Sequence, residues 1–137
     1  MENGISEKKV ASNPLVVIVD DDEAIRESIR SLTRSVGFRT EAFSSAEELL
    51  DSELLDEIDC LILDIRMQVM SGLELQQRLN ETGSKIPIIF ITAHYDEQLR
   101  TEALKAGAIA FLGKPFREEA LLESIDLALR GARGKDL

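Results

Sequence analysis

Residues that could carry out phosphoryl chemistry follow four apolar runs in this sequence. Asp20 and Asp21 come after VVIV, Asp64 after LIL, Thr92 after IIFI, and Lys114 after AFLG. Crowded carboxylates form a hard oxygen-donor site that suits Mg²⁺, and a carboxylate can attack phosphorus to give an aspartyl phosphate. A cation and a lysine would neutralise the phosphoryl oxygens, while a hydroxyl would bind them only when the phosphoryl group is present. Together these residue types predict a Mg²⁺-dependent phosphoryl site, provided that the fold brings them together.

Taken one at a time, these residues have ordinary explanations. A run of carboxylates after an apolar strand is typical of a helix start, where Asp caps the first turn and the helix dipole favours negative charge. We assign that role to Asp22 and Glu23, and we assign Asp20 and Asp21 to a metal site because of the other strand ends. Asp64 alone is more often a solvated strand end than a nucleophile, so the prediction depends on the whole set.

Short apolar runs alternate along the chain with stretches of helical spacing, which predicts five strands and five helices. This alternation is typical of an α/β fold with a parallel sheet covered on both faces. The second run carries Arg39 and Glu41, so we expect it at a sheet edge. In open parallel sheets, sites form beyond the carboxyl ends of the strands, which is where the polar residues lie. The predicted strands are 15–19, 39–43, 60–63, 86–91 and 109–112.

Each helical stretch has an apolar face that we expect to point toward the core, and several have residues that are typical of helix ends. Ser45 with Glu48 and Ser71 with Glu74 have the spacing of capping boxes. Four glycines follow helical stretches, where a residue of left-handed conformation is favoured. The expected inward faces are Ile25, Ile29, Leu32 and Val36, then Leu75 and Leu79, then Leu121, Ile125 and Ala128; the expected terminal glycines are Gly37, Gly83, Gly107 and Gly131.

Composition narrows the class of protein. The 137 residues are 44% hydrophobic and suit one domain, which we place at 14–131 between a flexible tail at 1–13 and a polar tail at 132–137. The net charge of −10 argues against direct nucleic-acid binding. The single cysteine, Cys60, lies in an apolar run and is expected in the core. With no signal peptide and no apolar run of membrane-spanning length, we predict a cytoplasmic location.

With these motifs in order, the sequence resembles response regulator receiver domains of two-component signalling. It is similar to the class with LRMPxMSG after the phosphorylated Asp. The resemblance rests on VVIVDD, LILDIRMQVMSG, FITAH and FLGKPF, and it covers roughly residues 15–130. It implies a flavodoxin-like, doubly wound (βα)5 fold with a five-stranded parallel sheet in the order 2-1-3-4-5.

The resemblance also implies roles for individual residues. Asp64 would accept the phosphoryl group from a phosphohistidine, and Asp20, Asp21, Asp64 and the backbone carbonyl of Arg66 would bind Mg²⁺. Thr92 and Lys114 would contact the phosphoryl oxygens.

Two further positions carry family roles in switching. Phe111 matches the aromatic switch position and would turn inward after phosphorylation, when Thr92 is drawn toward the site, although an aromatic residue here is also typical of plain core. This change would reshape the surface of the fourth helix, fifth strand and fifth helix. The family resemblance also supports a cis bond between Lys114 and Pro115.

One position departs from the family pattern, because Gln68 stands where proline is usual. Proline would fix the backbone next to the metal-binding carbonyl, so we expect a looser loop here. Arg66 and His94 could border the site and tune the lifetime of the phosphoryl group, although His94 is more often a solvated loop residue. Ala93 is small, which leaves room at the site.

Three functions remain open from the sequence. The first is a signalling switch that is phosphorylated by a sensor histidine kinase or phosphotransfer protein and acts on an output partner or a missing C-terminal output domain. It could form a homodimer on phosphorylation, and it would be a phosphoacceptor rather than an enzyme. The second is a receiver-like interaction module that works without phosphorylation. The third is a Mg²⁺-dependent phosphatase, which Arg66 disfavours because it replaces the second acid of a D-x-D motif.

Overall fold

The computed structural model describes residues 13–134 as five parallel strands surrounded by helices. The sheet order is β2-β1-β3-β4-β5, so the predicted flavodoxin-like fold and the edge position of the second strand are confirmed. The strands are β1 (Leu15–Val19), β2 (Arg39–Phe43), β3 (Cys60–Asp64), β4 (Ile88–Thr92) and β5 (Ala110–Gly113). The helices are α2 (Glu23–Ser35), α3 (Ala46–Asp51), α4 (Gly72–Glu81), α5 (Glu97–Lys105) and α6 (Glu118–Gly134), with a 3₁₀ turn, η1, at Leu55–Glu57.

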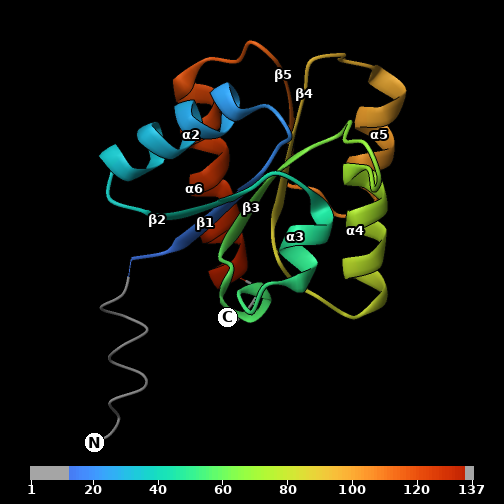
Figure 1. Ribbon diagram of the computed structural model, residues 1–137, viewed down its shortest axis with the longest axis horizontal. Coiled ribbons are helices and arrows are strands. Elements are labelled where there is room, and N and C mark those ends of the chain that lie inside the picture. Colours follow the sequence, from blue (N-terminus) through green and yellow to red (C-terminus); the bar gives the residue numbers. More distant parts are fainter. Residues whose placement is uncertain (1–12, 135–137) are drawn as a thin grey trace, which may run out of the picture.

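Helices cover both faces of the sheet, as Figure 1 shows. Because side chains alternate along a strand, neighbouring β1 residues enter different cores: Val17 packs on the α3–α5 side, and Ile18 packs on the α2 and α6 side. Cys60 is fully buried in the second core, and burial raises the pKa of its thiol to about 12. The predicted core role of this cysteine is therefore confirmed.

Most predicted helix ends agree with the structure. Ser71 and Glu74 form a complete capping box at the start of α4. Ser45 caps α3 by accepting from the Glu48 N–H, but the Glu48 carboxylate turns to Ser44, so only half of that box forms. Gly37, Gly83 and Gly107 have the expected positive φ.

Two details of the helix prediction are wrong. The helical spacing predicts Val36 on the inward face, but α2 ends at Ser35 and Gly37 reverses the chain, which leaves Val36 50% exposed. The sequence predicts that Gly131 follows the end of the last helix, but α6 continues through it to Gly134. Among residues 13–134, no helix combines the length and the apolar character needed to cross a bilayer.

Candidate functional site

Three aspartates meet where β1 and β3 end. Asp20 directly follows β1, Asp21 is next to it, and Asp64 is the last residue of β3. One carboxylate oxygen from each lies within 4.8 Å of the others. Because β1 and β3 are adjacent and parallel, their carboxyl ends share one edge of the sheet, and this register brings the predicted residues together.

Asp20 is fully buried and held by several neighbours. Its N–H donates to the Phe43 carbonyl at 3.1 Å, and one carboxylate oxygen accepts from the Asp22 N–H at 2.8 Å. Asp22 in turn caps α2 by accepting from the N–H groups of Ala24 and Ile25. The acidic run therefore divides as predicted, with Asp22 and Glu23 starting the helix while Asp20 faces the site.

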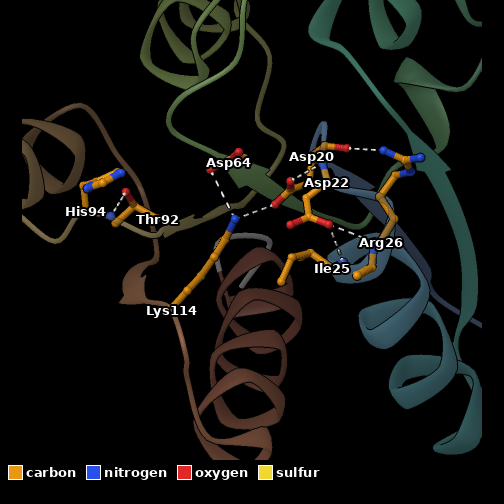
Figure 2. Close-up of polar contacts among 9 residues, drawn as sticks. Asp20, Asp22, Ile25, Arg26, Asp64, Thr92, His94 and Lys114 are labelled. Atoms are coloured by element: carbon orange, nitrogen blue, oxygen red, sulfur yellow. Dashed lines mark hydrogen bonds and ion pairs between the residues drawn. The ribbon is translucent and has the colours of Figure 1, made fainter.

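Lys114 joins two of the carboxylates, as Figure 2 shows. Its Nζ lies 2.9 Å from Asp20 Oδ2 and 3.6 Å from Asp64 Oδ1, and its side chain is only 14% exposed. The lysine directly follows β5, and its N–H donates to the Thr92 carbonyl of β4. The peptide between Lys114 and Pro115 is cis. One ammonium group thus bridges carboxylates from two separate strands.

The charge in this cluster is unbalanced toward negative. Burial, helped by the nearby Asp20 carboxylate, raises the pKa of Asp64 from 3.8 to about 6, even though Lys114 acts in the opposite direction. Three carboxylates that share a single ammonium group leave net negative charge at this edge of the sheet. Three clustered oxygen donors short of positive charge are the donor set that Mg²⁺ prefers, so these residues fit a magnesium ion.

Thr92 ends β4 beside the cluster and is 1% exposed. Its Oγ1 accepts a hydrogen bond from the His94 N–H at 3.0 Å, which leaves the hydroxyl proton available to a further acceptor. The side chains of Ala93 and His94 are exposed in the following loop. The loop that leaves β4 is therefore tied directly to the hydroxyl of Thr92.

The loop after Asp64 is pinned at its base. The Gly72 N–H donates to the Ile65 carbonyl at 2.9 Å, and Met70 is buried. Gly72 lies so close to the Asp64 carbonyl that a Cβ there would overlap it. Arg66 and Gln68 are exposed, so the position where proline is usual faces solvent while the ends of the loop stay fixed.

Phe111 lies in the interior of the structure. Its ring is 6% exposed, lies 6.3 Å from the Phe90 ring, and meets the Tyr95 ring edge-on at 5.6 Å. An inward ring fits both interpretations of this residue, a plain core side chain and a switch aromatic, so its switching role stays a prediction. The contact with Tyr95 covers the ring from the solvent side.

Sequence reasoning missed three residues that shape the site. The Arg26 guanidinium donates to the Asp20 carbonyl at 2.7 Å, Tyr95 covers Phe111, and Gly72 makes room for the Asp64 backbone. Arg26 lies one helical turn after the Asp22 cap, and this spacing could have indicated that its side chain reaches back toward the site. For Tyr95 the only hint was an aromatic residue three positions after Thr92.

Comparison with known proteins gives a consistent family signal. A model of the response regulator receiver domain matches residues 16–126. The response regulator protein TodT of Pseudomonas putida is 49% identical over 116 residues, which are 85% of this chain and 51% of TodT. TmoT of Ectopseudomonas mendocina is 51% identical over 85% of this chain and 53% of its own length. The chain thus spans about half the length of the curated relatives it matches.

Solved structures agree with this result. The response regulator StyR superposes with a TM-score of 0.81 at 46% identity, covering 91% of this chain and 66% of the StyR chain. A structure titled FixJ-N superposes with a TM-score of 0.77 at 36% identity and covers 87% of this chain and 95% of that one. The likeness therefore extends over nearly all of the described fold.

Proposed function

The chain belongs to the response regulator receiver domain family, a phosphoacceptor rather than an enzyme, and from this premise we propose that Asp64 accepts a phosphoryl group from a phosphohistidine. The donor would be a sensor histidine kinase or a phosphotransfer protein. The observation that carries the proposal is the bridge of Lys114 between Asp20 and Asp64, within a cluster of three carboxylates.

The positions of these groups support the following transfer. A carboxylate oxygen of Asp64 attacks phosphorus, and an O–P bond forms as the P–N bond of the donor breaks. The imidazole leaves with that electron pair and takes a proton from solvent. Asp20, Asp21, Asp64 and the Arg66 carbonyl would hold Mg²⁺, which supplies positive charge for the phosphoryl oxygens. Lys114 supplies a second positive charge, and its low exposure strengthens that interaction.

Switching would begin at Thr92. Its hydroxyl proton can donate to a phosphoryl oxygen on Asp64, a contact that exists only in the phosphorylated state. Such a contact shifts the population of loop conformations, because only one of the two states makes it. We propose that the shift alters the surface of α5, β5 and α6, which correspond to the fourth helix, fifth strand and fifth helix of the sequence prediction.

The domain limits and partners are also proposals. We place the receiver domain at 14–131, with tails at 1–13 and 132–137 and a cytoplasmic location. TdiR and FixJ, which are 41% and 38% identical to this chain, are named transcriptional regulatory proteins. We infer that the output is control of transcription through a partner or a further domain, with homodimer formation on phosphorylation as one route.

The test is incubation with acetyl phosphate and Mg²⁺, followed by intact mass measurement. We expect a gain of one phosphoryl group that EDTA prevents and that Asp64→Asn abolishes. If the folded protein gains no phosphoryl group, the proposal fails in its main point. The interaction module suggested by Gln68 would then take its place, and labelling of a Gln68→Pro variant would show whether this loop position is the cause.

A further inference from the structure

Tyr95 lies over the end of β5, in the loop between β4 and α5. Its ring meets Phe111 edge-on, with the two ring planes at 78°. A Cβ atom at Gly113 would make an ordinary van der Waals contact with the Tyr95 ring, 3.4 Å from Cδ2, so the ring lies directly over this end of the strand. Tyr95 remains 53% exposed while Phe111 is 6% exposed. The tyrosine ring is thus a cover that separates the phenylalanine from solvent.

The residues on either side of Tyr95 connect it to two other parts of the switch region. The preceding residue, His94, donates its N–H to Thr92 Oγ1. The Tyr95 hydroxyl donates to the Glu97 carboxylate at 2.8 Å, in the first turn of α5. Within six residues the chain therefore runs from the Thr92 hydroxyl, through the ring on Phe111, to the start of a helix.

The far end of α5 is held by different contacts. Gln76 of α4 donates its side-chain N–H to the Ala103 carbonyl at 3.1 Å, and Asn80 donates to the Ala106 carbonyl at 3.0 Å. These two bonds tie the C-terminal end of α5 to α4. A displacement that begins at Thr92 would therefore be expressed at the N-terminal end of α5, where Tyr95 lies.

We propose that Tyr95 is a positioning residue that links Thr92 to Phe111: its ring holds Phe111 inside, and its backbone follows the Thr92 hydroxyl through the His94 N–H. This inference rests on the proposed function, in which Thr92 binds a phosphoryl group on Asp64. Rotation of Thr92 toward that group takes Oγ1 away from the His94 N–H. The loop then shifts, and the Tyr95 ring changes its place over Phe111 and Gly113.

The chain provides its own optical probe, because Tyr95 is its single tyrosine and there is no tryptophan. Tyrosine fluorescence is measured before and after addition of Mg²⁺ and acetyl phosphate, and the intact mass of each sample is recorded. We expect the fluorescence to change in step with labelling in the parent chain and to stay constant in Asp64→Asn. Per molecule labelled, Thr92→Ala should lose the fluorescence change, whatever its rate of labelling.

The outcomes separate this inference from the proposed function. A parent chain that is labelled without any fluorescence change overturns the role of Tyr95 and leaves phosphorylation of Asp64 intact. A fluorescence change that persists in labelled Thr92→Ala also overturns it, because Tyr95 would then not depend on the hydroxyl. A parent chain that takes up no phosphoryl group overturns both.

A second experiment reads Phe111 directly and needs no phosphorylation. The protein is labelled with fluorophenylalanine, and the ¹⁹F resonance of Phe111 is assigned with Phe111→Leu. Tyr95→Ala should move this resonance toward the shift of a solvent-exposed ring. The matched control is Leu127→Ala on α6, since Leu127 is 52% exposed, and it should leave the resonance unchanged. An unchanged Phe111 resonance in Tyr95→Ala would contradict the proposed cover.

Discussion

Replacement of Asp64 by asparagine should stabilise the metal-free protein at neutral pH. The folded chain holds the pKa of Asp64 at about 6, against an ordinary value of 3.8. At pH 7 the carboxylate is thus charged in a buried place that disfavours its charge. Asparagine keeps the shape of the side chain and removes that charge. Lys114 retains its closer partner, Asp20, at 2.9 Å.

The size of this effect follows from the pKa difference. A pKa difference of one corresponds to about 1.36 kcal/mol between the two protonation states. A rise from 3.8 to about 6 therefore corresponds to about 3 kcal/mol of free energy. Asp64 is 5% exposed, but Asp21 beside it is exposed to solvent. This solvent screens part of the unfavourable energy of the Asp64 charge. We therefore expect Asp64→Asn to raise the free energy of unfolding by about 2–3 kcal/mol at pH 7.

The sign of the pH dependence is fixed by linkage. Because the folded-state pKa is raised, the folded state binds more protons than the unfolded state between about pH 4 and pH 6. The contribution of Asp64 to the free energy of unfolding of the parent chain therefore falls as pH rises through that window, and it stays low at higher pH. The advantage of Asp64→Asn should be small near pH 4 and complete at neutral pH.

The assay is urea unfolding followed by circular dichroism at several pH values in EDTA. Asp56→Asn provides the control, because Asp56 is an exposed carboxylate on η1. The reasoning is refuted if Asp64→Asn is no more stable than the parent chain at pH 7, or if its advantage is the same at every pH. Addition of Mg²⁺ should stabilise the parent more than the variant, since a ligand stabilises only the state that binds it.

Four further changes probe separate parts of the site. Lys114→Met should cost about 3 kcal/mol in urea unfolding at neutral pH, because it leaves buried carboxylates without their cation, and it should slow labelling by acetyl phosphate. Gly72→Ala should cost about 1–3 kcal/mol, since its Cβ overlaps the Asp64 carbonyl; a stable variant would show that the loop can move. Ser71→Ala should cost about 1 kcal/mol through loss of the α4 cap, with no change in the labelling rate. The hydrogen bond to Glu97 raises the pKa of the Tyr95 phenol, so Glu97→Gln should lower that pKa in an absorbance titration of tyrosinate.

The fold and the clustering of the aspartates were predictable because they depend on patterns that the chain repeats. Five apolar runs that alternate with helical spacing allow few arrangements, and parallel strands bring their carboxyl ends to one edge. Asp20 and Asp64 therefore meet once β1 and β3 are neighbours. The polar residues of the second run predicted its position at the sheet edge, because an edge strand is less buried than a central one.

The remaining features depend on side-chain direction and local backbone, which spacing does not record. Val36 has the period of the inward face of α2, yet the turn at Gly37 carries it outward. Gly131 has the sequence context of a helix end, but α6 continues through it. Tyr95 lies in a loop, where no period predicts which way a ring will point, and its contact with Phe111 emerges only from the folded chain.

The central claim is that Asp64, and neither Asp20 nor Asp21, accepts the phosphoryl group. The most direct measurement is reduction of the labelled protein with borohydride, which converts an aspartyl phosphate to homoserine, followed by peptide sequencing in a mass spectrometer. We predict homoserine at position 64 alone, and only when Mg²⁺ was present during labelling. Homoserine at position 20 or 21, or its absence from position 64 in a labelled sample, would contradict the proposed role of Asp64.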